Sequence, residues 1–165
     1  MVYKRNLDEI EWQEMGHGTR FRNERKTFTP FGESYMPKLG ITLYRLEPGK
    51  RAFPFHMHMA NDEAILVIEG TGTLRYGEEE IPLKANDYVH LPAHSGQAHQ
   101  MINSSDAPLL YYCLSSLISP EIVHYPDSGK MLAGAWIKDA DGSMRRDSTL
   151  CHPQKAEYWD GEAEE

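Results

Sequence analysis

The sequence is poor in cysteine. Its two cysteines, Cys113 and Cys151, lie far apart and neither belongs to a CxxC pair, so they indicate neither a disulfide framework nor a zinc knuckle. This usage suits a reducing compartment, and we expect a cytoplasmic protein. A chain of 165 residues fits one domain and buries about two thirds of its unfolded surface, so it needs no covalent cross-link.

Long apolar runs and a basic surface are also missing. No apolar stretch approaches the roughly 18 residues of a membrane helix, and residues 1–15 lack the apolar core of a secretion signal. The net charge is −8, and much of it comes from residues 157–165, which contain several acids and no base. Such a chain offers little to nucleic acid or to an anionic membrane. We therefore expect a soluble, unprocessed protein that binds neither.

Short apolar runs separated by turn residues dominate the middle of the chain. They occupy residues 39–46, 51–57, 64–70, 73–77, 80–84, 88–92, 99–103 and 109–116. Runs of this length at nearly regular spacing are typical of an all-β sandwich or barrel. Sequences such as Glu47-Pro48-Gly49 and Ala85-Asn86-Asp87 favour hairpin turns between them. The pattern predicts one all-β barrel.

We divide the chain into three segments. Residues 1–38 form an N-terminal arm that packs on the barrel, residues 39–119 form the barrel core, and residues 120–165 form a C-terminal extension. The extension is predicted to contain one strand at residues 131–137, turn-rich sequence elsewhere and a partly disordered acidic tail. Both faces of residues 64–68 are apolar, so the arm or a second subunit must cover the outer face. We expect a homodimer.

The stretch FHMHMANDE, residues 55–63, contains two histidines and an acid at a notable spacing. His56 and His58 are two residues apart, so on a strand they point to the same face. His99 opens a later run, where an antiparallel barrel could return it beside the first pair. Together with Glu63 they make three imidazoles and one carboxylate, which suits one divalent Fe, Mn, Ni, Co or Zn ion. An isolated HxH pair is as readily explained by surface or core histidines.

The wider spacing carries a family resemblance. It reads Gly49-x6-His56-x-His58-x4-Glu63-x6-Gly70, followed by Pro92-x3-Gly96-x2-His99-x3-Asn103. This resembles the two motifs of the cupin superfamily, which implies a double-stranded β-helix (jelly-roll) barrel. The resemblance places the metal ligands on His56, His58, Glu63 and His99. The stretches PAHSGQAHQ, YPDSGK and YWDGE are similar to a group of small single-domain cupins of unassigned function.

The sequence predicts the fold more specifically than it predicts the function. With neutral histidines and an ionised Glu63, a divalent ion leaves about one positive charge, which favours an anionic oxygen ligand. We expect a metal-dependent enzyme acting on a small anionic or oxygen-rich metabolite, with a slight preference for dioxygenase-type oxidation. Isomerase and decarboxylase chemistry stay open, because cupins with such a ligand set perform all three. So do a non-catalytic protein that binds a sugar-like small molecule and a metal-free structural barrel.

Other polar residues give weaker signals. His90 and His94 flank Pro92 and could act as acid or base, although loop histidines are more often solvated. Packing is the ordinary role of the strand tyrosines, with a phenol left to bind substrate: Tyr44, Tyr76, Tyr111 and Tyr112. A solvated surface role is the ordinary one for three arginines that could pair with an anionic substrate: Arg45, Arg51 and Arg75. Cys113 is predicted to be a buried apolar side chain.

Overall fold

The computed structural model describes residues 3–29 and 37–162, and it confirms the all-β fold class. Within these ranges the only helices are two short 3-10 helices, η1 (Leu7–Glu9) and η2 (Pro126–Ser128). None of the helices in the described ranges is long and apolar enough to cross a membrane. The end of the acidic tail, residues 163–165, lies outside the described residues.

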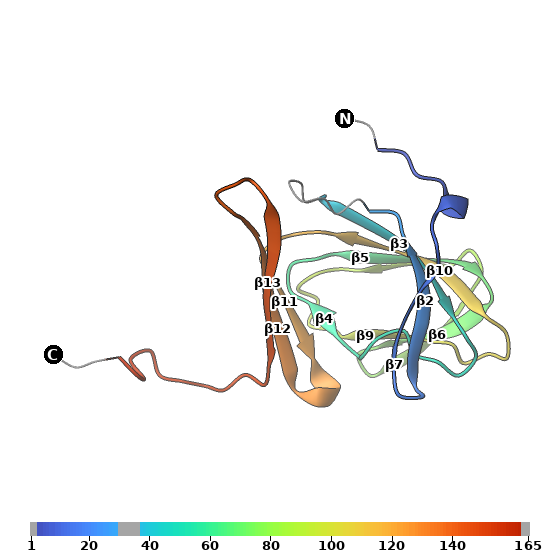
Figure 1. The fold of residues 1–165 in the computed structure, drawn as a ribbon. Coiled ribbons are helices and arrows are strands. Elements are labelled where there is room, and N and C mark those ends of the chain that lie inside the picture. The colour runs from blue at the N-terminus through green and yellow to red at the C-terminus, as the bar shows by residue number, and fades with distance from the viewer. Residues whose placement is uncertain (1–2, 30–36, 163–165) are drawn as a thin grey trace.

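The strands form three antiparallel sheets in a jelly-roll arrangement (Figure 1). The largest sheet has the order β1 (Gln13–His17), β2 (Phe21–Thr27), β3 (Leu39–Leu46), β10 (Leu109–Ser116), β5 (Glu63–Glu69) and β8 (Tyr88–Leu91). The second has the order β7 (Glu79–Lys84), β6 (Thr71–Tyr76) and β9 (His99–Ile102). The third has the order β13 (Met144–Cys151), β12 (Lys130–Lys138), β11 (Glu121–Tyr125) and β4 (Met57–His58).

Alternating apolar residues of the strands fill the barrel core. Its buried members are Leu46, Ala52, Ile65, Val67, Leu74, Leu83, Leu91, Met101, Leu109 and Tyr111. The predicted turns fall where the backbone needs them, since Gly49, Gly77 and Asn86 all adopt positive φ. Gly70 also has positive φ, and a Cβ there would collide with the carbonyl oxygen of Pro108. The hairpins therefore close without strain.

Both ends of the chain contain more strand than the sequence indicated. Residues 13–27 form β1 and β2, which extend the largest sheet, and the extension contains β11 and β13 in addition to β12. The prediction of a single strand there was wrong. Strand β13 reads MRRDSTLC, and most of its side chains are exposed, so no apolar alternation marks it. Residues 51–57 were predicted as a strand, yet within that range only Met57 belongs to one, β4.

The outer face of β5 is exposed in the single chain. Leu66 is 36% and Ile68 is 43% solvent-exposed, so the described residues of the chain do not supply the cover expected over this face. A second subunit would supply it, and the homodimer stays a prediction. The division into arm, barrel and extension and the cytoplasmic location also stay predictions.

Candidate metal centre

The four predicted ligands come from strands β4, β5 and β9 and from the residue directly before β4, and these meet at one point. His56 and His99 face each other in an antiparallel bridge, in which each backbone N–H donates to the other's carbonyl, at 3.1 and 2.7 Å. His58 lies on β4, and Glu63 is the first residue of β5. The bridge joins the segment before β4 to β9, so the backbone itself brings residues distant in sequence together.

The ligand atoms of these residues form a compact cluster. One atom from each of His56, His58, Glu63 and His99 lies within 4.8 Å of the others. The Nε2 atom of His99 lies 3.0 Å and that of His58 3.6 Å from Oε2 of Glu63. Three imidazoles and a carboxylate this close together are compatible with one divalent metal ion.

The hydrogen bonds around the cluster fit a metal. The Nδ1 atom of His56 lies 2.8 Å from the carbonyl oxygen of Pro54, so it donates there and leaves Nε2 with a free lone pair. Both ring nitrogens of His58 are buried, and neither has a hydrogen-bond partner among the residues that the structure describes. Buried polar atoms without partners are unusual, and a metal bound to His58 would satisfy one of them.

The protonation of two members of the cluster, His56 and Glu63, also suits a metal. Burial and the neighbouring His99 lower the pKa of His56 to about 4, so its ring is neutral at physiological pH. Burial alone would raise the pKa of Glu63, but the hydrogen bond with His99 and the nearby imidazoles lower it to about 2. Metals bind neutral imidazoles and ionised carboxylates, so these two residues are ready to bind without losing a proton.

Glu121 supports the cluster from the C-terminal extension, and no sequence motif pointed to this residue. Its carboxylate accepts hydrogen bonds from the backbone N–H groups of Met59, Ala60 and Asn61, at 3.0, 3.1 and 2.8 Å. Its Oε2 atom also lies 3.9 Å from Nδ1 of His58. Burial would raise the pKa of Glu121, but His58 and the backbone donors lower it. Glu121 thus fixes the loop that separates His58 from Glu63.

A cavity of about 380 Å³ adjoins the cluster. Besides the cluster it is lined by Arg25, Tyr44, Ala52, Phe53, Ile65, Gln100, Met101, Tyr111, Cys113 and Arg146. The rings of Tyr44 and Tyr111 stack with centroids 5.4 Å apart. Burial raises the pKa of both phenols, so they stay protonated and can donate hydrogen bonds at neutral pH. Cys113, predicted to be buried, is only partly buried, and its thiol lies 3.7 Å from Oε1 of Glu63.

Comparison with known proteins assigns the barrel to a family. Residues 42–115, which include all four residues of the cluster, match the family model of the cupin domain. The protein contains a cupin domain. No curated protein matches the chain.

Solved structures resemble nearly the whole chain. A candidate sugar phosphate isomerase from Acidithiobacillus ferrooxidans superposes with a TM-score of 0.69 at 20% identity, covering 92% of this chain and 91% of its own. A sugar phosphate isomerase of the cupin superfamily from Silicibacter pomeroyi gives a TM-score of 0.65 at 25% identity, covering 88% and 92%. A predicted oxalate decarboxylase from Thermotoga maritima gives 0.56 at 18% identity, covering 72% and 100%. The likeness therefore extends beyond the residues matched to the cupin domain.

The other histidines and tyrosines that the sequence singled out lie mostly outside the cavity of the cupin domain. His90 is exposed on β8, and the exposed His94 borders a separate hollow beside β11. Tyr76 packs against the core, and Tyr112 lies against Phe28. Of the four strand tyrosines, only Tyr44 and Tyr111 reach the cavity.

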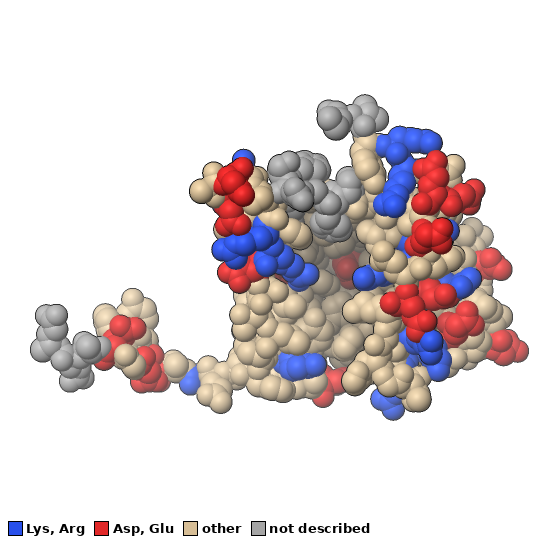
Figure 2. Space-filling model, viewed as in Figure 1, with Lys and Arg blue, Asp and Glu red and all other residues tan. Residues whose placement is uncertain are grey.

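The arginines at the cavity are different from those that the sequence singled out. Arg45 pairs with Glu24, Arg51 donates to Oε1 of Gln100, and Arg75 forms a two-point ion pair with Asp127. The two that line the cavity are Arg25 and Arg146. Sequence reasoning missed both, because each lies on a strand without an apolar pattern. Figure 2 shows basic side chains gathered over the β11–β13 sheet, beside the hollow that separates it from the barrel.

Proposed function

We propose that the protein is a metal-dependent enzyme acting on a small, anionic, oxygen-rich metabolite. The four-residue cluster in the wall of a cavity carries this proposal. His56, His58, Glu63 and His99 would hold one divalent Fe, Mn, Ni, Co or Zn ion. The ion would supply a Lewis acid with up to two open coordination positions. A cavity of about 380 Å³ lies at the lower end of the range for small-molecule sites.

The cavity walls are equipped to bind substrate, and they contain no separate base. Glu63 is the only carboxylate among the described residues that line the cavity, and every lining imidazole belongs to the cluster. The neutral phenols of Tyr44 and Tyr111 can donate hydrogen bonds to substrate oxygens, whereas Ile65 and Met101 exclude water. Proton abstraction by an independent side chain is therefore disfavoured, which supports oxidation as the first reaction to test.

Isomerisation of a hydroxycarbonyl compound is the second candidate. It is supported by the Silicibacter pomeroyi protein, which is named a sugar phosphate isomerase and shares 25% identity over most of both chains. Oxidation consumes dioxygen and isomerisation does not, so one set of assays separates them. A non-catalytic binding protein would retain its ligand without converting it.

The metal is tested first. We expect about one transition-metal ion per chain in protein purified without a histidine tag, and we expect the His58→Ala variant to lose it. His90→Ala is the matched control, because it removes an exposed imidazole outside the cavity and should retain the metal. Elemental mass spectrometry reads all three samples. A wild type that stays empty after reconstitution with each of the five metals contradicts the proposal.

Turnover is tested second, on the metal-loaded protein. Oxygen uptake is followed with a panel of enediols, catechols and 2-hydroxy acids, and sugar phosphates are followed by nuclear magnetic resonance for isomerisation. Turnover that disappears in His58→Ala supports the enzyme. A metal-loaded protein that converts no member of either panel, yet retains a small molecule unchanged through purification, favours the binding protein instead.

A further inference from the structure

Arg25 points into the cavity because of its place in the largest sheet. It lies on β2 directly opposite Tyr44 of β3, and Tyr44 lies directly opposite Tyr111 of β10. Directly opposed residues of neighbouring strands share a face of the sheet. Tyr44 and Tyr111 line the cavity. Arg25 lies beside Tyr44 on the same face of the sheet, so it lines the cavity as well.

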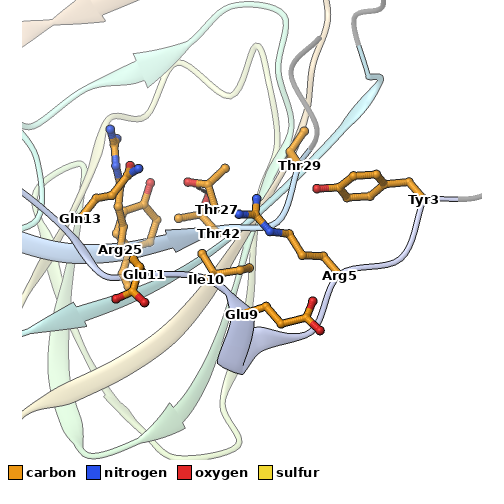
Figure 3. A pocket seen from close by; sticks show the side chains of 11 residues that line it. Tyr3, Arg5, Glu9, Ile10, Glu11, Gln13, Arg25, Thr27, Thr29 and Thr42 are labelled. Carbon is orange, nitrogen blue, oxygen red and sulfur yellow. Dashed lines mark hydrogen bonds between the residues drawn. The ribbon is translucent and has the colours of Figure 1, made fainter.

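Among the described residues, the guanidinium of Arg25 has no counter-ion. Its Nε atom is buried without a hydrogen-bond partner there, and its Nη1 atom donates to the sulfur of Met15, at 3.6 Å. Figure 3 shows Arg25 on the wall of a second cleft, of about 800 Å³, with its guanidinium directed away from the carboxylate of Glu11. Arg25 and Tyr44 line both spaces. Arg25 is partly buried, and a partly buried positive charge without a counter-ion is stabilised when an anion binds beside it.

Arg146 reaches the same cavity from β13, in a different sheet from Arg25. It lies on β13, opposite Trp136 of β12, and no ion pair holds it in the described residues. Its charge acts on the phenol of Tyr125, whose ring stacks on His56 of the cluster with centroids 6.1 Å apart. The neighbouring Arg145 is engaged elsewhere, with Asp139 and Asp147. Arg146 is thus the arginine of β13 that remains available to a ligand.

The charge balance of the cavity favours an anion. Two arginines line it, and its only carboxylate among the described residues, Glu63, belongs to the metal cluster. A bound divalent ion would make the net charge of the cavity more positive. Guanidinium groups bind carboxylates and phosphates through two parallel hydrogen bonds, so both anion types fit.

We propose that Arg25 and Arg146 form an anion-binding subsite, which holds the carboxylate or phosphate of the metabolite while its other oxygens face the metal cluster. This subsite deepens the proposed function and rests on it for the identity of the reacting end. Anion binding by the two arginines does not itself require turnover. The substrate is then a small molecule with an anionic group at one end and oxygen ligands at the other.

The test compares arginine variants with two matched probes. Binding of glycerol 3-phosphate and of glycerate, which present a phosphate and a carboxylate on a three-carbon skeleton, is measured by calorimetry on the purified protein. The variants are Arg25→Gln and Arg146→Gln. Their controls are Arg22→Gln, which removes an exposed arginine paired with Glu14, and Arg145→Gln. Metal content and the thermal unfolding midpoint are recorded for each sample.

We expect Arg25→Gln and Arg146→Gln each to lower the affinity for the tighter-binding probe about tenfold or more, since a charged hydrogen bond contributes about 1.5–3 kcal/mol. The controls should stay within about twofold of wild type. The preferred probe identifies the anion as phosphate or carboxylate. Uncharged glycerol should not bind, and Arg25→Lys should bind better than Arg25→Gln because it keeps the charge.

Two results would overturn the subsite: equal affinity in folded Arg25→Gln, Arg146→Gln and wild type, or no binding of either probe to wild type. If Arg25→Gln does not fold, Arg146→Gln decides, because its side chain is exposed and its loss should not affect folding. Arginine-dependent binding by a protein that takes up no metal would support the subsite and contradict the proposed enzyme. A metal-loaded protein whose affinity for the probes is independent of both arginines would contradict the subsite and leave the proposed enzyme standing.

Discussion

The candidate metal ligands and the two arginines that line the same cavity differ in how firmly their neighbours hold them in place. The cluster lies where strands of the barrel meet, and it is fixed by the backbone bridge of His56 with His99 and by the carboxylate of Glu121. The two arginines lie on β2 and β13, strands outside the residues matched to the cupin domain, and no ion pair with another described residue fixes either of them. Under the proposed function, the residues matched to the cupin domain would hold the metal, whereas β2 and β13 would supply the side chains that bind the anionic group of the substrate.

Asn103 offers the strongest way to disturb the cluster without touching a ligand. It directly follows β9 and is fully buried, and its side chain donates to the carbonyl oxygens of Leu46 and Ala107, both at 2.7 Å. Asn103→Ala leaves these acceptors without their donor and removes the acceptor for the N–H of Ser105. We expect the free energy of unfolding to fall by about 3 kcal/mol.

Urea unfolding followed by circular dichroism measures this loss. Ser104→Ala is the control, because its exposed hydroxyl contacts only that of Thr73 and its removal should change stability by less than about 0.5 kcal/mol. Equal stability of the two variants would show that the frame of the cluster does not depend on this buried amide.

Glu121→Ala tests whether the extension also supports the cluster. Removing the carboxylate frees three backbone N–H groups between His58 and Glu63, so the two ligands lose their fixed separation. We expect metal affinity to fall about 10- to 100-fold, as for other residues that orient metal ligands. Competition with a fluorescent chelator measures it. The control is Glu69→Ala, which removes an exposed acid at the end of β5 and should bind metal like wild type. An unchanged metal affinity in Glu121→Ala would show that the C-terminal extension does not help to position the ligands.

The reactivity of the two cysteines also compares the cluster with the outer strand β13, and we expect a smaller difference there. Burial and the charge of Glu63 raise the pKa of Cys113 well above its usual value, so little thiolate forms there at pH 8. Cys151 ends the outer strand β13. We expect iodoacetamide to modify Cys151 at least about tenfold faster, as measured by peptide mass spectrometry. Equal rates would show that solvent and reagent reach the cluster wall as freely as the outer sheet.

The sequence predicted the barrel better than its additions, for a physical reason. In the barrel, burial imposes an apolar alternation that can be read directly, and the spacing of His56, His58 and Glu63 follows from strand geometry. The structure brings these residues and His99 together as expected. Strands β2 and β13 carry mostly polar side chains, so the alternation that would reveal them is absent.

Arg25 and Glu121 could not be found for a related reason. Their roles depend on which strand pairs with which, and a strand register is a long-range property that local sequence does not encode. The stretch FRNERKT does place Asn23, Arg25 and Thr27 on one face of a strand, and Asn23 is indeed buried. Only the pairing with β3 shows that this face turns toward the cavity.

The pairing of β4 determines when the site can form during synthesis. This two-residue strand carries His58, and its only partner among the described strands is β11, whose Glu121 binds a backbone N–H 62 residues earlier in the chain. A ribosome makes residues 56–63 and 99 first, but the loop between the ligands closes only after β11 has emerged. Under the proposed function, metal binding would therefore follow the emergence of β11, and a chain truncated before Glu121 would contain all four proposed ligands without the contact that holds the loop between His58 and Glu63.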